Sequence, residues 1–352
     1  MALPSIREKP QCIDGWVTCH VSLAACSCLC HLKYDMLNVL LVTFPFFALV
    51  LTGYIATYRG WLALPAIPGL NGFVLYFAVP CMLYRFGANT PVAELFNPVV
   101  FGLYLSVALV MVALAIGVTK RDGIGWNDAS LGALVAAFPN TGFMGVPLLA
   151  AILGAASAGP AIATILIDLV ITSSLCVALS RLDGAGVAGA KRAAKLALTG
   201  VVGNPMPWAI VLGAVASAYQ VVLPTPIGDS VALLANAASP VALFTIGAVL
   251  ARSQMTSAHA MPVSHYLPVV VLKLLVHPLL VFVGALIARA MGFELDVFTL
   301  TCLLLVAALP SASNVSLLAE RFGADNGRIA RIILLTTTAS FVTFSAVVSW
   351  RV

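Results

Sequence analysis

Two short stretches place prolines, glycines and small polar residues inside long apolar runs: FPNTGFMGVP at residues 138–147 and ALPSASNVS at residues 308–316. Lipid offers no hydrogen-bond partner to backbone that leaves a helix, so such breaks are tolerated only where protein or water satisfies them. Each break ends one half-helix and starts another, and a helix start carries free N–H groups and the positive end of the helix dipole. Two such starts predict a binding site for an anion.

The polar side chains of both stretches can donate and accept hydrogen bonds. The polar residues that we expect to contact a substrate there are Asn140, Thr141, Ser311, Ser313 and Asn314, with Gly142 beside the first two. The alternative is a pair of kinked helices whose polar side chains bond across the bundle, a common packing device in membranes. We favour a site because the breaks fall at corresponding places in two repeated halves of the chain.

Ionisable residues deep within apolar runs are costly and are candidates for function. Asp168 shares one helical face with Thr164 and Thr172, four residues away on either side. A carboxylate there can take up a proton as its surroundings lose water, which suits ion coupling. The alternative is a structural, hydrogen-bonded aspartate or one half of a buried ion pair.

Two further ion-coupling candidates, Lys273 and His277, are spaced four residues apart on one face of a predicted helix. His277 could relay protons, or it could be a packing residue beside Pro278. Lys273 could pair with Asp168 or with the substrate, or extend its ammonium toward the cytoplasm.

Arg85 lies near the outer end of the apolar run 66–87. It is a candidate for direct substrate contact, with an interfacial anchor or an anion-attracting charge at the mouth as alternatives. The positions that the repeat places opposite Arg85, Asp168 and His277 are uncharged. Charge present in one half only is what coupling or substrate polarity would add.

The elements that carry these residues are predicted membrane helices, because the chain of 352 residues is 61% hydrophobic and only 9% charged. Apolar runs near the ~20 residues that span a bilayer recur, without the short alternating strands of a barrel. The fold class is thus an all-α integral membrane protein. The ten expected spans are approximately residues 37–57, 66–87, 98–119, 129–153, 160–181, 205–223, 231–251, 267–291, 297–320 and 329–350.

The first half of the chain is repeated in the second half. Pro45, Gly53, Pro80 and Gly87 recur as the same residue types 160 positions later, and Pro139 recurs 171 positions later as Pro310. Five spans are an odd number, so the second half must cross the membrane in the opposite sense. The repeat therefore predicts a 5+5 inverted architecture of the secondary-transporter kind, with spans 4 and 9 as two broken crossover helices.

Basic residues indicate the orientation, because cytoplasmic connections carry an excess of Lys and Arg. The odd-numbered connections hold most of them: Arg59, Lys120, Arg121, Arg181, Lys191, Arg192, Lys195, Arg252, Arg321, Arg328 and Arg331. We therefore expect these connections in the cytoplasm, both ends of the ten-span unit outside, and the protein in the cell (inner) membrane. The expected parts are a first repeat at 36–182, a cytoplasmic linker at 183–204 and a second repeat at 205–352.

Residues 1–35 do not fit this pattern, since they hold five of the eight cysteines. Closely spaced thiols could form a metal or redox tail. We favour a dispensable extension, with Met36 opening the functional chain, because CSCLC lacks the paired CxxC motifs of zinc sites.

The stretches FPNTGFMGVPLLAAILG, ALPSASNVSLLAERFG and LKLLVHPLL resemble the two crossover segments and the eighth span of the auxin efflux carrier family, which includes plant PIN-type carriers and bacterial malonate carriers. The resemblance covers about residues 36–351. It implies ten helices, an elevator-like alternating-access motion and transport of small organic anions. It also implies substrate contact by Asn140 and Asn314 with their prolines. The linker is short here, so the regulatory phosphorylation of long-loop plant carriers is not implied.

The favoured function is secondary active transport of a small, malonate-like carboxylate, coupled to a proton or a sodium ion. The alternatives are a ligand-binding membrane sensor and an efflux carrier for an auxin-like weak acid. An enzyme is disfavoured because HExxH, GxSxG and Walker motifs are missing from the sequence. We expect no cofactor, no resident metal and no nucleic acid partner, while the lipid bilayer is a required partner and a homodimer stays open.

Overall fold

The computed structural model describes residues 36–120, 124–182, 202–256 and 261–351, together with positions 189, 192, 195 and 199. Contacts divide the chain into one unit at residues 1–33 and a second unit at residues 34–352. The cysteine-rich extension and most of the linker lie outside the described residues, so the expectations for them stay untested. Everything below concerns the second unit.

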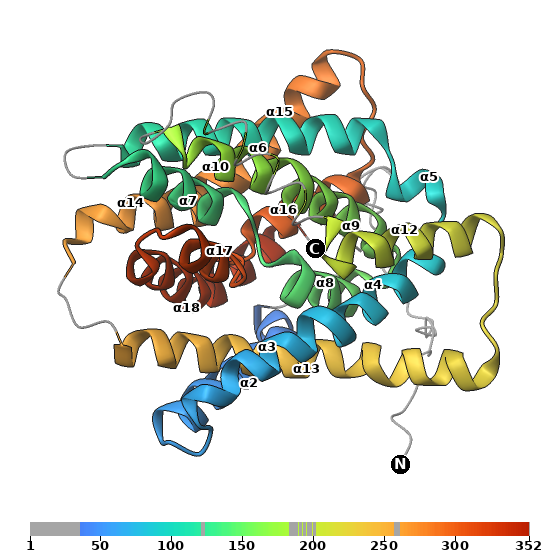
Figure 1. Cartoon of the computed structure of the whole chain (residues 1–352). Helices are drawn as coiled ribbons and strands as arrows, with labels where there is room; N and C mark the ends of the chain where they lie inside the picture. Colours follow the sequence, from blue (N-terminus) through green and yellow to red (C-terminus); the bar gives the residue numbers. More distant parts are fainter. Residues whose placement is uncertain are drawn as a thin grey trace, which may run out of the picture. The chain divides into compact units, whose positions relative to one another are not determined.

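The described residues are mainly helical, and their β structure is limited to one isolated bridge between Pro139 and Ser311. The all-α fold class is therefore confirmed. The elements, of which Figure 1 labels the α-helices, are α2 Met36–Tyr58, α3 Ile67–Phe73, η2 Val74–Ala78, α4 Val79–Ala88, α5 Val92–Leu95, α6 Pro98–Thr119, α7 Trp126–Ala137, η3 Thr141–Gly145, α8 Val146–Leu153, α9 Ala158–Leu166, η5 Ile167–Thr172, α10 Ser173–Leu179, α12 Pro205–Ala218, α13 Thr225–Thr256, α14 Leu267–Val271, η7 Leu272–Val276, α15 His277–Ala290, α16 Val297–Ala308, α17 Val315–Phe322 and α18 Asn326–Arg351.

Six of the described helical segments are long and apolar enough to cross a membrane: Leu64–Ala88, Val92–Thr119, Ala155–Leu179, Thr225–Met255, Leu267–Ala290 and Asn326–Arg351. Four shorter apolar helices occupy the places of the other expected spans: Thr43–Tyr58, Thr141–Leu153, Pro205–Ala218 and Val297–Ala308. The chain is thus a multi-pass membrane protein by length and composition, while the count of ten spans stays a prediction.

One predicted boundary is clearly wrong. The span expected at 231–251 belongs to α13, which continues for 32 residues from Thr225 to Thr256. Pro240 lies inside this helix without ending it. Membrane helices tolerate an internal proline because neighbouring helices can satisfy the freed backbone.

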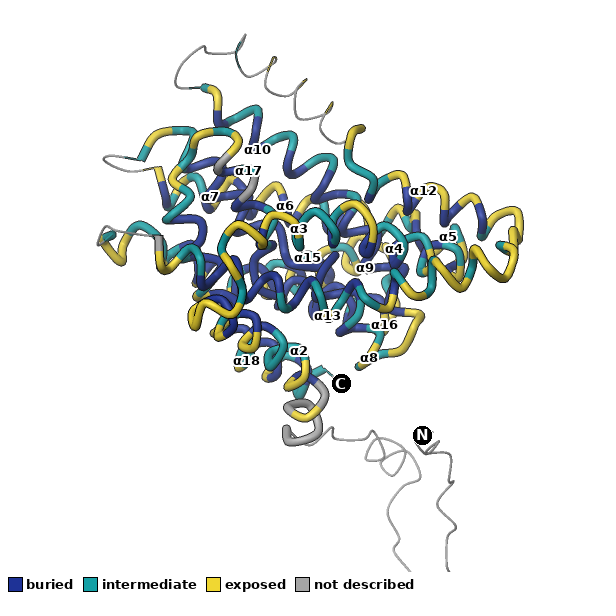
Figure 2. Tube along the Cα trace, turned by 60° about the horizontal axis from the view of Figure 1, so that its bottom comes forward, coloured by how far each residue is buried: buried dark blue, intermediate teal, exposed yellow. Residues whose placement is uncertain are grey.

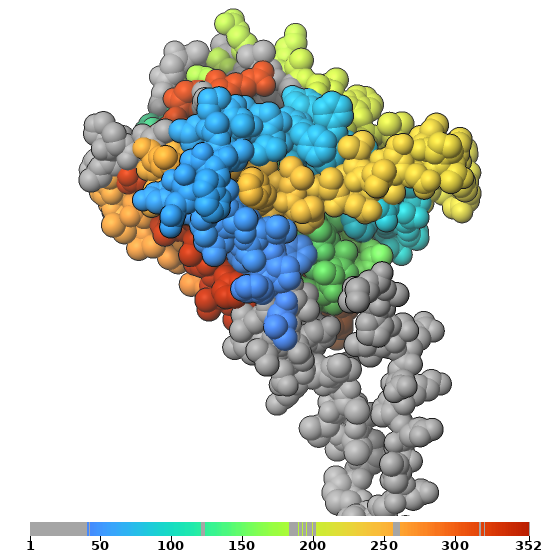
Figure 3. Space-filling model, turned by 90° about the horizontal axis from the view of Figure 1, so that it is seen from below, coloured from blue at the N-terminus to red at the C-terminus, as the bar shows by residue number. Residues whose placement is uncertain are grey.

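A first group of helices packs around α13, which runs along the bottom of Figure 1 with α2 and α4 beside it. Figure 3 shows the same face from below, where α13 lies against the blue segments of the first half. Glycines allow the close approach: a Cβ on Gly53 would overlap the backbone of Phe244, and one on Gly247 would overlap the backbone of Val50.

A second glycine pair repeats the first. A Cβ on Gly87 of α4 would lie 3.3 Å from the Cα of Gly213 in α12. Adding 160 to Gly53 and subtracting 160 from Gly247 gives Gly213 and Gly87. The contact of α2 with α13 and the contact of α4 with α12 are therefore related by the same offset that relates the sequences.

A second group of helices contains α6, α7, α9, α10 and α14 to α18. At its centre are α7 and α16, whose residues 129–137 and 301–309 are all buried, as the dark blue of Figure 2 shows for α7. Each has 12 residues, about 18 Å of helix, against about 30 Å of hydrocarbon. A helix buried on every side belongs in a protein core. The C-terminal ends of α7 and α16 therefore lie inside the protein rather than at its surface.

Candidate functional site

The ends of α7 and α16 meet in a short antiparallel contact. The Asn140 N–H donates to the Pro310 carbonyl at 2.8 Å, and the Ala312 N–H donates to the Phe138 carbonyl at 2.9 Å. We call residues 138–142 and 309–314 the crossing. Proline has no N–H to donate. In each of the two segments, a nearby residue therefore donates its N–H to a backbone carbonyl of the other segment. Backbone groups at the two breaks are therefore hydrogen-bonded within the protein.

A helix begins at the C-terminal end of each of the two segments of the crossing. Met144 and Gly145 both donate their N–H groups to the Asn140 carbonyl, which begins η3 and then α8. On the other chain, Ser316 donates to the Ser313 carbonyl at the start of α17. The first N–H groups of a helix have no acceptor within it, so both starts present donors and a positive dipole end near the crossing.

Three side-chain oxygens at the crossing are buried and have no hydrogen-bond partner among the described residues: Thr141 Oγ1, Ser311 Oγ and Asn314 Oδ1. An unsatisfied buried polar group costs about 1–3 kcal/mol. Asn140 is 4% exposed, whereas Ser313 and Asn314 are half-buried. The crossing thus combines unpartnered polar atoms with partial access.

A second polar cluster lies among α6, η5, η7 and α15; its members are Tyr104, Asp168, Thr172, Lys273 and His277, and we call it the Asp168 cluster. The carboxylate accepts from the Tyr104 hydroxyl at 2.9 Å and from the Thr172 hydroxyl at 3.2 Å. Lys273 Nζ lies 2.9 Å from His277 Nδ1. Lys273 and Asp168 also interact electrostatically. All five side chains are buried.

The Asp168 cluster is joined to the crossing by one hydrogen bond. Lys273 Nζ donates to the Ala307 carbonyl at 3.1 Å. Ala307 is the penultimate residue of α16 and lies two residues before Leu309, where the second segment of the crossing begins. The structure therefore brings the predicted ion-coupling residues next to the predicted substrate-contact residues.

Three elements that carry these residues are π-helical turns: η3 with Thr141, η5 with Asp168 and η7 with Lys273. Directly after η5, the hydroxyl of Ser173, the first residue of α10, donates to the Asp168 carbonyl five residues earlier, at 2.7 Å. Such wide turns are rare and are frequently found at functional sites. The apolar pattern of the sequence contains no signal for them.

Arg85 does not join this site. Its side chain is exposed on α4, and its guanidinium donates to Asn236 Oδ1 of α13 at 2.9 Å. Thr164 is buried, and its hydroxyl donates to the Ala161 carbonyl at 2.8 Å. Thr164 and Thr172 are both expected on the helical face of Asp168. In the described contacts, Thr172 is the one that donates to the Asp168 carboxylate.

Sequence reasoning missed Tyr104, whose hydroxyl is a direct partner of Asp168. A tyrosine in the middle of an apolar run was the available signal. It also misjudged Arg328, which it counted as a loop charge. Arg328 is 2% exposed, and its Nε and Nη1 donate to the carbonyls of His265 and Asp128 at 2.7 and 2.8 Å. Those carbonyls compensate the cost of its burial.

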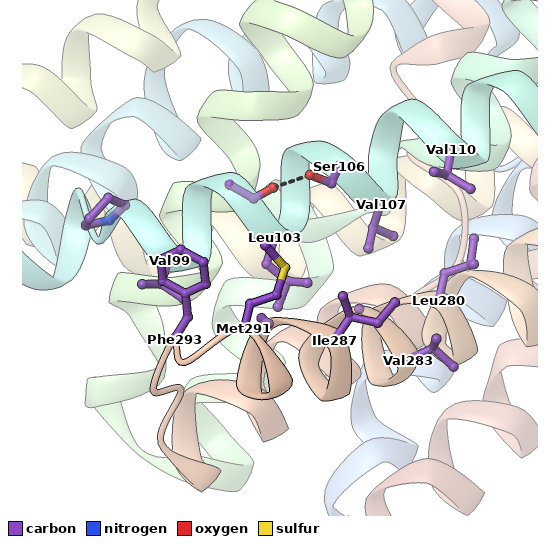
Figure 4. A pocket seen from close by; sticks show the side chains of 14 residues that line it. Val99, Leu103, Ser106, Val107, Val110, Leu280, Val283, Ile287, Met291 and Phe293 are labelled. Carbon is purple, nitrogen blue, oxygen red and sulfur yellow. Dashed lines mark hydrogen bonds between the residues drawn. The ribbon is translucent and has the colours of Figure 1, made fainter.

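Two cavities lie away from the crossing. Figure 4 shows a cavity of about 520 Å³ between α6 and α15, lined by apolar side chains such as Leu103, Ile287 and Phe293. Ser106 is its polar exception, and its hydroxyl donates to the carbonyl of Gly102. An anion would lose its hydration there without a charged partner, so we do not place the substrate in this cavity.

The other cavity, of about 310 Å³, lies between the end of α13 and the start of α18. Arg331, Ser253 and Gln254 contribute polar atoms to its lining. Its last lining residue, Leu335, precedes Thr336, whose hydroxyl accepts from the Ser311 N–H at 3.3 Å. Thr336 is not among the lining residues, so the cavity stops short of the crossing.

The apolar helices and the buried polar groups between them describe a polytopic membrane protein with a polar interior, an organisation that transporters use. A family model described as "Membrane transport protein" matches residues 39–187 and 190–348. The chain belongs to this family, which is the auxin efflux carrier family, and the resemblance drawn from the crossing motifs is confirmed.

Relatives in bacteria and plants are similar to the chain. It is 28% identical over 306 residues to a Rhizobium meliloti (strain 1021) protein named "Putative malonate transporter", covering 85% of this chain and 91% of that protein. It is 25% identical over 287 residues to the Escherichia coli (strain K12) protein "Uncharacterized transporter YfdV", covering 79% and 86%. Against "Auxin efflux carrier component 4" of Arabidopsis thaliana, identity is 28% over 156 residues, covering 43% and 25%.

Proposed function

We propose that the protein is a secondary active transporter that moves small, malonate-like carboxylates across the cell (inner) membrane by alternating access. The observation that carries this proposal is the crossing, where two helix starts and three unpartnered buried oxygens lie together. Helix starts favour anions, and broken helices at such a place are the substrate sites of many secondary transporters. Membership of a transporter family supports transport over catalysis or sensing.

The proposed architecture is ten spans in two inverted halves, residues 36–182 and 205–352, joined by a linker at 183–204. The offset that relates the two glycine pairs supports this repeat. The family match also divides at residues 188–189, inside the proposed linker. In this arrangement the helices around α13 form a scaffold, and the group with α7 and α16 carries the site.

The proposed substrate contacts are Asn140, Thr141, Gly142, Ser311, Ser313 and Asn314, held by the prolines Pro139 and Pro310. Asp168, Lys273 and His277 are the proposed ion-coupling residues, because Lys273 connects them to the end of α16. Arg85 is proposed only as a charge that attracts anions at the surface, since it is exposed and paired with Asn236.

Malonate is the proposed substrate because the relative from Rhizobium meliloti carries that name and because the site favours a small anion. The test is uptake of labelled malonate by purified protein in liposomes, with excess unlabelled malonate, succinate, acetate or an indole carboxylic acid as competitor. Malonate should compete most strongly. Stronger competition by the indole acid would favour a weak-acid efflux carrier instead. Binding of malonate without any uptake would favour a sensor.

A further inference from the structure

We propose that the Lys273 ammonium takes the place of an inorganic cation at the end of α16, so that a proton, and not sodium, is the coupling ion. This inference rests on the proposed transport function and adds the identity of the ion to it. Four observations carry the inference: the position of Lys273, its contact with His277, the charges that face it, and the difference between the two halves of the chain.

The Lys273 ammonium lies where other transporters bind an inorganic cation. The last carbonyls of a helix have no donor within the helix and form the negative end of its dipole. Carbonyls at the ends of broken helices are where transporters coordinate their cations. Lys273 Nζ donates to such a carbonyl, that of Ala307, at 3.1 Å, and the side chain is fully buried. The protein thus supplies its own positive charge there.

The contact with His277 makes this charge exchangeable. Lys273 Nζ lies 2.9 Å from His277 Nδ1, so one of the two nitrogens must accept while the other donates. An ammonium can only donate, so beside it His277 accepts at Nδ1 and is neutral. Lys273 and His277 therefore cannot both be positively charged in this geometry. The Asp168 cluster gains or loses one proton at a time.

The charge of Lys273 is balanced by Asp168, whose own neighbours come from η5, α6 and α10. Asp168 lies on η5 and interacts electrostatically with Lys273. Tyr104 of α6 and Thr172 donate to the carboxylate of Asp168, and Cys176 of α10 is buried near it. With Lys273 as an ammonium and Asp168 as a carboxylate, the cluster is neutral. Loss of one proton leaves it with a net negative charge.

That negative charge would oppose an anion at the crossing, which begins two residues after Ala307. Buried like charges repel much more strongly than charges in water. An anion therefore binds better to the protonated cluster, and by thermodynamic reciprocity the bound anion favours the proton. Proton and anion enter together, so the coupling is symport.

The two halves of the chain differ at this point. The third and eighth spans are related by an offset of 170 residues, which aligns residues 98–100 (PVV) with residues 268–270 (PVV). This offset places Leu103 opposite Lys273. Leu103 is an apolar residue that lines the cavity between α6 and α15. A lysine needed for packing of the repeat would have a counterpart in the first half. A transport site that needs one cation requires a lysine in one half only, as is found for Lys273.

The first arm of the test uses the wild-type protein in liposomes at zero membrane potential. An inward gradient of one pH unit should support about tenfold accumulation of labelled malonate for one proton per anion. An inward sodium gradient at equal pH should support none. Accumulation driven by the sodium gradient would overturn the proposal. A wild type that exchanges no malonate at all would instead remove the substrate assignment of the proposed function.

The second arm needs no substrate. Thermal unfolding of the purified full-length protein should occur at the same temperature in sodium chloride as in choline chloride. A sodium ion that binds the folded protein would raise the unfolding temperature increasingly as the sodium concentration exceeds its dissociation constant. Specific stabilisation by sodium would overturn the proposal even if malonate is not the substrate.

The third arm uses Lys273→Arg, which keeps a cation beside the Ala307 carbonyl but cannot release a proton. Exchange of malonate should fall but remain above that of protein-free liposomes, while accumulation driven by the pH gradient should be lost. Lys273→Gln should show the same loss. Lys120→Gln is the matched control, since Lys120 is exposed and lies over the Trp126 ring. Full proton-driven accumulation by Lys273→Arg would overturn the proposal.

Discussion

At the scale of single residues, the site depends on a few buried polar side chains that sequence spacing could single out but not connect. Asp168, Lys273 and His277 were predictable because each interrupts an apolar run. Their partners were not, because the rotation of one helix against another decides which side chains meet. Tyr104 lies on α6 and Asp168 on η5, and only the packing of these elements brings the hydroxyl within 2.9 Å of the carboxylate.

Tyr104 is a positioning residue for Asp168, and Tyr104→Phe tests this role. The variant keeps the ring and removes one donor to the carboxylate, a hydrogen bond worth about 1.5–3 kcal/mol when one group is charged. Proton-driven uptake should fall by about tenfold or more, and its pH profile should move to higher pH, because the carboxylate loses a group that stabilises its charged form.

The control for this variant is Tyr219→Phe, since the Tyr219 side chain is 79% exposed. The control should leave both the rate and the pH profile unchanged. A Tyr104→Phe protein with reduced uptake but an unchanged pH profile would indicate a packing role only.

At the scale of elements, the breaks at Pro139 and Pro310 could be predicted because proline and glycine inside an apolar run are visible in the sequence. The π-helical turns η3, η5 and η7 could not be predicted, because a wide turn depends on which backbone and side-chain acceptors surround it. Pro240 lies within the expected span 231–251, and α13 does continue through it. Proline marks a break only where the neighbouring backbone also leaves the helix.

The close contact between α2 and α13 depends on small residues. Gly247→Ala would place a Cβ on the backbone of Val50, and overpacking of this kind typically costs about 1–3 kcal/mol. The unfolding temperature of the purified protein should fall. Gly228→Ala in the same helix is the control, because its Cβ would meet atoms no closer than 3.9 Å. The control should be neutral or slightly stabilising, since alanine favours helix. Equal stability of both variants would contradict the close packing.

At the scale of the whole molecule, the all-α fold class could be predicted from composition and the family from the crossing motifs, and both are confirmed. The ten-span inverted repeat stays a prediction. The orientation rests on basic residues alone. Arg328 shows the limit of such counting, because a buried arginine hydrogen-bonded to two carbonyls fixes packing rather than topology. The remaining basic residues still favour odd-numbered connections in the cytoplasm.

Orientation is testable with single cysteines at exposed positions of two connections. Lys120→Cys lies in the third connection, and Val222→Cys, at a side chain that is 90% exposed, lies in the sixth. The background would replace the five cysteines of residues 1–35 by serine. A membrane-impermeant maleimide added to intact cells should label position 222 and spare position 120. The reverse pattern would invert the proposed topology.

The central claim is that a small anion binds at the crossing during transport. The most direct measurement is exchange of labelled malonate across liposomes by wild type, Asn140→Ala, Asn314→Ala and the control Asn89→Ala, whose exposed side chain donates to the Arg85 carbonyl. Loss of a hydrogen bond to a charged ligand costs about 1.5–3 kcal/mol, or about 10- to 100-fold in affinity. We predict that loss in both crossing variants and wild-type exchange in the control. Undiminished exchange by folded Asn140→Ala and Asn314→Ala proteins would contradict a site at the crossing.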